Sequence, residues 1–244
     1  KIYIIMKYQV FIEGETVDLV VPSKHAVEKT EWYNWFNNVK FTKYLIHHGL
    51  FPNTIDNQKI VLKRMIESNK KKIGLFLLIA EKKTHKLVGV SSLSKIDWIN
   101  RSAYMAVIMS PFRKKDFVFN SVETKALLTK HAFEKLNLNK VRTSQVLELA
   151  EWQKYSNLFG YKVEGIARSH YLKDNKFYDV CFHSCLLKDY LKHKQKLGEN
   201  FWPGKKIFFK MMLKYPRGDV YEKIKKSISI QNDIFDKKVE KIIK

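Results

Sequence analysis

The sequence lacks the features that define several common classes of protein. Its two cysteines, Cys181 and Cys185, lie in a run typical of a strand, about 13 Å apart and so too far for a disulfide. No histidine or cysteine partners lie at ligand spacing, which argues against a zinc or other metal site. The longest apolar run, Leu75–Ala80, is far shorter than the roughly 18 residues that cross a membrane. We expect a cytoplasmic protein with two packing thiols, no metal and no membrane span.

Arginine is also scarce, because six arginines accompany 40 lysines in a chain of net charge +22. Proteins that read bases depend on arginine forks gathered on one face. No recognition helix, zinc finger or RNA-binding aromatic motif occurs, and the lysine excess fits an AT-rich coding bias that spreads lysine over solvated faces. Nucleic acid is therefore not expected as a partner, whereas a small anionic ligand is.

What the sequence does contain is enough apolar material for a core, since 45% of its residues are hydrophobic and 14% aromatic. Hairpin-length connections predict antiparallel pairing of the early strands, and a later strand-helix-strand passage predicts parallel pairing. The prediction is an α/β fold with a mixed, partly antiparallel sheet of six to seven strands, flanked by helices. The expected strands are 8–12 and 16–21 (a hairpin or one bent strand), 74–80, 87–93, 103–109, 141–146, 161–171 and 177–187. The expected helices are 25–37, 54–68, 121–136 and 148–159.

The character of the chain changes near residue 190. We assign residues 1–190 to the domain and 191–244 to a basic, helical C-terminal extension with a short helix at 207–213 and an amphipathic helix at 219–244. From residue 188 onward 16 Lys and Arg accompany 7 Asp and Glu, a net charge of +9. Such a helix can lie on a membrane surface or a partner; the alternative is packing on its own domain or in a homodimer.

One stretch combines a strand, a cationic loop and a helix start. The strand 103–109 is followed by Ser110 and Pro111 and by a loop that carries Arg113, Lys114 and Lys115. The next helix is expected from about residue 121, with Asn120 and Glu123 in a capping-box arrangement. Free backbone N–H groups and the helix dipole converge at such a helix start. The stretch therefore predicts an anion-binding site.

Six phrases, in this order and spacing, are similar to one known family. They are 14–21; Trp32 with 35–38; 79–81 with 87–89; 103–111; 123–128 with 131–136; and 159–165 with Tyr178 and Asp179. Together they resemble the GNAT superfamily of acetyl-CoA-dependent N-acetyltransferases. The nearest branch is the one with ribosomal-protein alanine and amino-sugar acetyltransferases.

The resemblance implies where acetyl-CoA, the co-substrate, would bind. Its pantetheine arm would lie along the fourth strand, on backbone groups of Val107, Ile108 and Met109, with an N–H near Ile108 polarising the thioester carbonyl. Its pyrophosphate would contact Arg113, Lys114, Lys115, Phe119, Asn120 and Ser121. Direct transfer needs alignment of amine and thioester rather than a covalent enzyme intermediate.

The chain departs from the family pattern in the cofactor loop, which has no glycine. Depending on the register, Asp116 and Val118 or Phe117 and Phe119 stand at the glycine positions. Leu149 replaces the Asn that commonly opens the next helix, and Ser156 replaces the tyrosine that often protonates the departing thiolate. These departures leave open whether the site is fully competent.

Two residues are candidates for the base that takes a proton from the attacking amine. Histidine titrates near neutral pH, and His170 lies on a strand expected to reach the acceptor; the alternative is an ordinary strand histidine. Glu164 begins the same strand, where its place in a Glu-Gly phrase indicates a structural role as much as a chemical one. On the acceptor side we expect contacts from Trp35, His48 with its neighbour His47, Tyr104 and Tyr171.

These observations predict an N-acetyltransferase that moves an acetyl group directly to a primary amine. We favour a small amine, in particular a nucleotide-linked amino sugar, because an aromatic helix suits a sugar and lysines attract a diphosphate. A protein N-terminus is the alternative acceptor. A non-catalytic binding or scaffold protein, in which the extension is the working part, is the alternative of another class.

Overall fold

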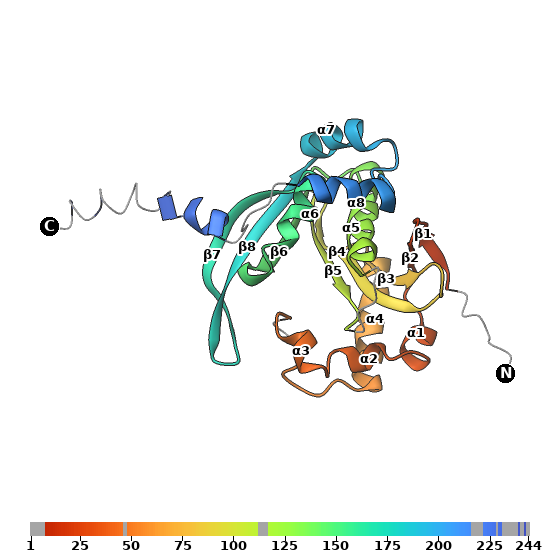
Figure 1. The fold of residues 1–244 in the computed structure, drawn as a ribbon. Coiled ribbons are helices and arrows are strands. Elements are labelled where there is room, and N and C mark those ends of the chain that lie inside the picture. Colours follow the sequence, from red (N-terminus) through yellow and green to blue (C-terminus); the bar gives the residue numbers. More distant parts are fainter. Residues whose placement is uncertain are drawn as a thin grey trace.

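The computed structural model describes residues 8–45, 48–111, 117–215, 222–227, 229–230, 239 and 242, and its centre is a mixed sheet of eight strands (Figure 1). The strands are β1 (Val10–Ile12), β2 (Val17–Val20), β3 (Leu75–Glu81), β4 (Leu87–Asp97), β5 (Ser102–Met109), β6 (Lys140–Val146), β7 (Lys162–Lys173) and β8 (Lys176–Leu186). Their spatial order is β1-β2-β3-β4-β5-β6-β8-β7.

Antiparallel pairs dominate the sheet, as the short connections predict. Among the described strands only β5 and β6 run parallel, and an α-helical crossover joins them. The mixed α/β class is confirmed, but the expected number of strands was too low. The first two runs form a hairpin, with Val10 opposite Val20, instead of one bent strand.

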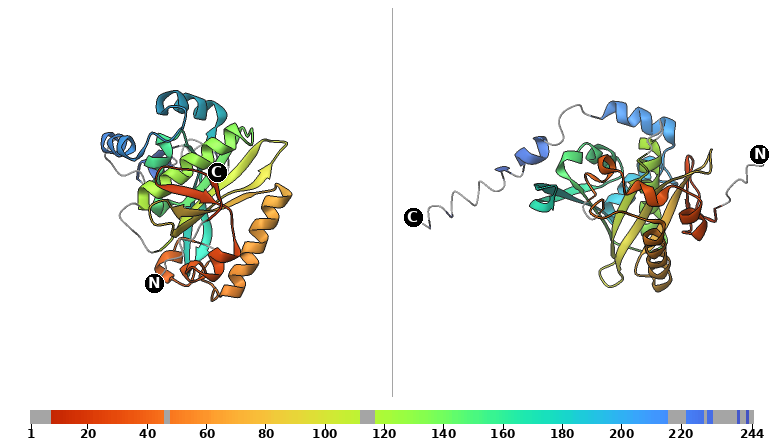
Figure 2. Two further views of the ribbon diagram at one scale, coloured as in Figure 1. Left: turned by 90° about the vertical axis from the view of Figure 1, so that its right-hand side faces the viewer. Right: turned by 90° about the horizontal axis from the view of Figure 1, so that it is seen from below.

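Helices cover both faces of the sheet (Figures 1 and 2). One face carries α1 (Lys24–Glu28), α2 (Trp32–Trp35) and α4 (Ile55–Lys71), whose apolar side chains form one core cluster with β2 and β3. The other face carries α5 (Phe117–Glu134) and α6 (Trp152–Leu158), which form the larger cluster. A short helix, α3 (Val39–Thr42), follows α2. The sheet is therefore the middle layer of three.

Three expected helices have different bounds. The helix expected at 25–37 is broken into α1 and α2 near Thr30. The Thr30 hydroxyl donates to the Ala26 carbonyl and accepts from the Trp32 N–H, so these side-chain hydrogen bonds replace backbone bonds of a continuous helix. The helix expected at 148–159 is a 3-10 turn (Leu147–Leu149) followed by α6. The helix expected from residue 121 already includes Phe117.

The early start of α5 also overturns the expected capping box. Glu123 is fully buried inside the helix and accepts hydrogen bonds from the backbone N–H groups of Glu15 and Thr16. Asn120 is buried beside it and accepts from the Thr16 hydroxyl at 3.0 Å. Both side chains therefore hold the β1–β2 connection against α5 through hydrogen bonds, and neither caps the helix. At α4, in contrast, a side chain does cap the helix, because the Thr54 hydroxyl accepts from the Asn57 N–H.

The first part of the extension packs on the main core. It contains most of α7 (Leu187–Leu197), which begins within the assigned domain, and all of α8 (Lys205–Lys214), which confirms the short helix expected at 207–213. Phe201 and Phe208 are fully buried in the larger cluster. Residues 222–227 are helical, whereas most of the expected helix at 219–244 lies outside the described residues. No helix in the described part of the chain is long and apolar enough to cross a membrane.

Candidate functional site

The sheet opens between β5 and β6. These strands pair at only three positions, Ser102 with Lys140, Ala103 with Val141, and Tyr104 with Arg142. Beyond Tyr104, β5 continues to Met109 beside β4, but within the described residues it has no partner strand on the β6 side. An extended ligand can therefore hydrogen bond to this free edge of β5.

Strand alternation decides which backbone groups face this opening. The Ser110 N–H donates to the Val88 carbonyl on β4 at 2.7 Å. The Ile108 carbonyl also points toward β4, so near Gly89 that a Cβ there would lie 2.8 Å from it. Because the direction alternates along a strand, the groups of Val107 and Met109 face the opening. The expected carbonyl-polarising N–H is therefore better placed on Val107 or Met109 than on Ile108.

Some of the expected pyrophosphate contacts lie outside the described residues. These are Arg113, Lys114 and Lys115, together with the neighbouring Asp116. Phe119, Asn120 and Ser121 lie in the first turns of α5 rather than in a loop. Phe119 packs against Phe208 and Phe209 of α8, with ring centroids 6.2 and 6.4 Å away.

Aromatic side chains also fill the space between the first turns of α5 and α6. The rings of Phe117 and Trp152 meet edge to face at 6.1 Å, and Tyr155 lies 5.0 Å from Trp152 and 6.2 Å from Phe208. Any ligand that reaches the opening past these helix starts would contact apolar rings as well as backbone N–H groups.

A lysine of unusual environment lies deeper between the same two helices. The ammonium group of Lys125, on α5, donates to Ser156 Oγ on α6 at 2.6 Å and lies 4.0 Å from the ring centroid of Tyr161. Desolvation by these buried neighbours lowers the pKa of Lys125 to about 7. We had not selected Lys125 from the sequence, although its spacing of three from Val122 and Leu128, both buried, places it toward the core.

On the opposite face of the sheet a cavity of about 210 Å³ lies between the α2–α4 layer and strands β4 and β5. Trp32, Phe36 and His48 line it, with the His48 ring stacked on Phe36 at 4.3 Å. Trp35, expected at the acceptor site, is instead buried in the core behind the cavity wall. Of the residues expected on the acceptor side, His48 lines this cavity, Trp35 does not, and His47 lies outside the described residues.

The cavity also contains buried donors without partners. The Nε1 of Trp32 and the Nε2 of Gln58 have no hydrogen-bond partner in the described structure, although both residues are 1% exposed. The Oε1 of Gln58 accepts from Asn53 Nδ2 at 2.9 Å, which fixes the amide orientation. Buried donors of this kind suit a ligand that brings hydrogen-bond acceptors.

Tyr104 lies at the mouth of the opening between two cations. The guanidinium carbon of Arg142 is 5.4 Å from the Tyr104 ring centroid, and the Lys95 ammonium is 5.7 Å from it. Arg142 also donates to the Tyr104 hydroxyl at 3.3 Å, while its Nε has no partner among the described residues. The sequence alone does not point to Arg142 or Lys95, because the pairing of β5 with β6 brings Arg142 to Tyr104 and the pairing of β5 with β4 brings Lys95 there.

The two candidate bases differ in their surroundings. His170 is exposed on β7, with its ring 4.5 Å from that of Tyr171 and 5.6 Å from that of Phe182. Glu164 is ion-paired with Lys140 and accepts from the Ser184 hydroxyl at 2.8 Å. Partial burial raises the pKa of Glu164, but these hydrogen bonds lower it on balance, which makes this carboxylate a weak base. Of the two, His170 therefore remains the candidate for the base.

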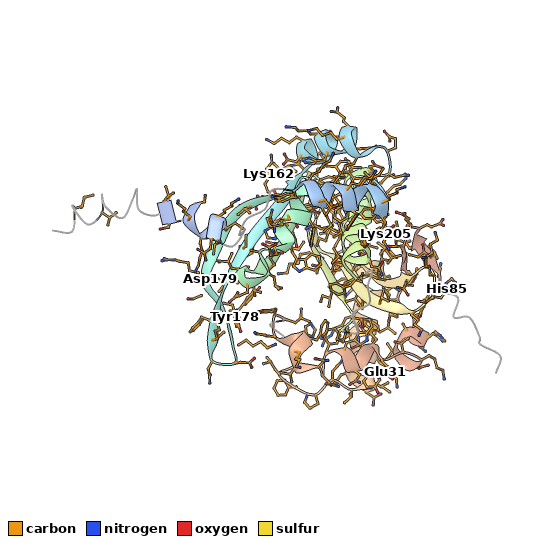
Figure 3. All side chains as sticks on the ribbon, in the orientation of Figure 1. Glu31, His85, Lys162, Tyr178, Asp179 and Lys205 are labelled. Carbon is orange, nitrogen blue, oxygen red and sulfur yellow. The ribbon has the colours of Figure 1, made fainter. Side chains whose placement is uncertain are left out.

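The β7–β8 hairpin is fastened to the loop that carries His48. Lys173, which is 6% exposed, donates to the carbonyls of Thr42, Leu45 and His48. On the same hairpin Tyr178, labelled in Figure 3, meets the ring of Tyr44 edge to face at 6.1 Å. The acceptor side is therefore bounded by the hairpin and by the segment after α3.

The cysteines and metal-binding residue types form no further site. Cys181 and Cys185 are both buried and free, as expected of packing thiols. Among the residues that the structure describes, no three His, Cys, Asp or Glu side chains gather in a group that could hold a metal ion.

The order of the strands, the opening and the flanking helices are those of the GNAT fold. RimL, a ribosomal L7/L12 alpha-N-protein acetyltransferase solved with coenzyme A, matches with a TM-score of 0.64 and 12% identity, over 75% of this chain and 99% of that one. Spermidine N-acetyltransferase from Vibrio cholerae, solved with CoA and spermine, matches with a TM-score of 0.62 and 19% identity, over 73% and 99%. The microcin C7 self-immunity acetyltransferase MccE, solved with acetyl-CoA and AMP, matches with a TM-score of 0.60 and 20% identity, over 71% and 94%.

These likenesses confirm the fold that the six phrases predict: the chain has the GNAT fold. No protein-family profile matches the sequence, and no curated protein sequence matches it significantly. At the identities above, the fold is what the comparisons establish.

Proposed function

We propose that this protein is an acetyl-CoA-dependent N-acetyltransferase that passes the acetyl group directly to a primary amine. The observation that carries the proposal is the opening between β5 and β6, which frees the backbone groups of Val107 and Met109 in a sheet of GNAT type. A pantetheine arm can bind there as an added strand, and one of these N–H groups can hold the oxyanion that forms at the thioester carbonyl. Bound acetyl-CoA supplies the activated acetyl group.

The expected cofactor contacts fit this reading in part. The cationic loop of Arg113, Lys114 and Lys115 would offset the charge of a pyrophosphate, while the aromatic rings of Phe119 and Trp152 offer surfaces for an adenine. His170 and a chain of waters would take the proton from the amine. These assignments, with Asn120 and Ser121 at the helix start, remain predictions.

For the acceptor we propose a small amine that carries an anionic group, such as a nucleotide-linked amino sugar. Arg142 and Lys95 flank Tyr104 at the mouth of the opening, and the Nε of Arg142 has no hydrogen-bond partner among the described residues. The spermine that one neighbour binds calls for acidic side chains, whereas no Asp or Glu is among the described residues that line the cavity beside α2. A net charge of +22 also favours anions over polyamines.

A protein N-terminus is the second acceptor, as the likeness to RimL suggests. It would need a groove that admits an extended chain. The fastening of the β7–β8 hairpin by Lys173 bounds the acceptor side and favours a smaller molecule.

A non-catalytic GNAT-fold binding protein is the second candidate function. The aromatic contacts of Phe117 and Phe119, with no glycine near, favour it because they occupy the space at the helix starts. In that case the extension, or a homodimer formed through it, would be the working part.

Calorimetry with acetyl-CoA separates these functions. Heat of binding, followed by thiol release with amino-sugar nucleotides or N-terminal peptides, supports the enzyme and identifies its acceptor. No heat and no thermal shift at millimolar acetyl-CoA would contradict it.

The acceptor proposal has its own test. Arg142→Met should raise the KM of an anionic amine at least tenfold and leave that of an uncharged amine unchanged. Arg64→Met, on the exposed side of α4, is the matched control.

A further inference from the structure

The outward face of α8, in the C-terminal extension, carries a combination of side chains that the fold does not use. α8 lies on the outside of the molecule, on the side away from α1 to α4 (Figure 1). Phe208 and Met212, one turn apart, pack on the main core, and Phe208 is fully buried. The contact with the core therefore occupies one row of this ten-residue helix, and the other rows face outward.

Large apolar side chains are exposed on those outward rows. Leu213 is 70% exposed, Ile207 55% and Phe209 50%. Phe209 still contacts the ring of Phe119, whereas Ile207 and Leu213 belong to no core cluster of the described residues. Three such side chains within seven residues of one short helix form an apolar patch, which in a folded protein commonly marks an interaction surface.

A row of lysines runs through the same face. Lys206, Lys210 and Lys214 recur every four residues, so their side chains line one side of the helix over about 12 Å. At the helical period this row lies between Leu213 on one side and Ile207 on the other. None of the three lysines forms an ion pair or hydrogen bond within the described part of the chain.

The local sequence leaves this positive charge uncompensated. Between Glu199 and Asp219 the chain has five Lys and Arg residues and no Asp or Glu. α4 provides the contrast, because it also exposes aliphatic side chains but pairs lysines with acids of its own helix, at 3.0 Å for Asp56 and 2.7 Å for Glu67. The face of α8 therefore calls for a partner that brings negative charge together with an apolar region.

The surface of an anionic bilayer has both properties. Lipid phosphates attract lysines, and the boundary of the acyl chains accepts aliphatic side chains. A second copy of this chain fits less well, because a two-fold contact between α8 helices would bring the lysine rows of both copies together. Nucleic acid would pair with the lysines but would leave Ile207 and Leu213 in water.

We propose that the outward face of α8 docks this protein on an anionic phospholipid membrane. Lys206, Lys210 and Lys214 contact the headgroup phosphates, and Ile207 and Leu213 enter the boundary of the acyl chains. The main core keeps its contact with α8, and the cavity beside α2 and α4, on the opposite face of the sheet, stays accessible. The proposal goes beyond the acetyltransferase function and does not rest on it.

The test is sedimentation of the full chain with vesicles of phosphatidylcholine, with and without phosphatidylglycerol. Wild type should bind the mixed vesicles and not phosphatidylcholine alone. Replacing Lys206, Lys210 and Lys214 together by Gln should lower the partition coefficient about 100-fold, because each basic residue contributes about fivefold at an anionic surface. Ile207→Ser with Leu213→Ser should lower it at least about tenfold without any change in charge.

Matched changes on α4 are the controls. Replacing Lys59, Lys63 and Lys70 together by Gln removes the same charge, and Ile60→Ser with Ile66→Ser removes exposed aliphatic side chains. Both variants should bind the mixed vesicles as wild type does. Urea unfolding of every variant verifies that the substitutions leave the folded state intact, as expected for exposed positions.

Three results would overturn the proposal. Wild type that does not sediment with the mixed vesicles has no affinity for such a surface. An equal loss for the lysine variants of α4 and α8 would show that net charge, and not the face of α8, causes binding. An unchanged partition coefficient for Ile207→Ser with Leu213→Ser would indicate a polyanion in place of a membrane, and binding to a duplex DNA oligonucleotide would then identify nucleic acid as the partner.

Discussion

Replacing Lys125 by methionine should stabilise the protein. The pKa of this lysine falls from 10.5 to about 7 on folding, and each unit corresponds to about 1.4 kcal/mol. The full penalty is therefore about 5 kcal/mol, and because part of the side chain keeps contact with solvent we expect a gain of about 3–5 kcal/mol at pH 7 and below. Met has similar length and no charge, so it avoids this cost.

The sign of the pH dependence is fixed by linkage. Between pH 7 and 10.5 the folded state binds fewer protons at Lys125 than the unfolded state does, so the stability of wild type rises with pH across this window. The advantage of Lys125→Met should therefore shrink by up to about 1.4 kcal/mol per pH unit above pH 7 and vanish near pH 10.5. Other titrating groups are common to both chains and cancel in the difference.

Urea unfolding of both chains at pH 6, 8 and 9.5 measures this difference, with Lys130→Met as the control for loss of one surface charge. The reasoning is refuted if Lys125→Met is the less stable chain at pH 6. A stability difference that is the same at all three pH values would refute the depressed pKa instead.

Three further changes test other contacts. Glu123→Ala should cost about 2–5 kcal/mol in urea unfolding, because it leaves two N–H groups of the β1–β2 connection without acceptors; Glu148→Ala, at a more exposed ion pair, should cost under about 1 kcal/mol. Phe208→Ala should cost about 3–5 kcal/mol through a cavity under α8, whereas an equal loss for the half-exposed Phe209→Ala would contradict burial as the cause. Lys173→Met should raise the KM for the acceptor about tenfold by releasing three carbonyls of the segment after α3, and an unchanged KM would separate this segment from acceptor binding.

The strands could be predicted from the sequence because their signals are local. Alternating apolar residues and short turns fix a strand within a few residues, and the GNAT order follows from the succession of such segments. The helix bounds were less predictable where a side chain competes with the backbone. Thr30 breaks the first helix. Asn120 and Glu123 have the spacing of a capping box in the sequence, but in the structure both accept hydrogen bonds from Thr16.

The candidate site was predictable only where one strand carries it. Val107 and Met109 follow from their place on the fourth family strand, and the structure adds only which way their backbone groups point. Arg142 and Lys125 could not be selected from the sequence, because their surroundings are set by residues distant in sequence, Tyr104 and Ser156 respectively. A lysine in a lysine-rich chain gives no sign of its role until its neighbours in space are known.

The aromatic residues at the start of α5 and the C-terminal extension belong to one structural solution. GNAT chains usually place small residues at this turn, whereas Phe117 and Phe119 would expose two rings there. Trp152 covers the first ring, and Phe208, with Phe209, covers the second from α8. The aromatic turn and α8 therefore depend on each other: without α8 the ring of Phe119 would lose the two rings of the extension that pack against it.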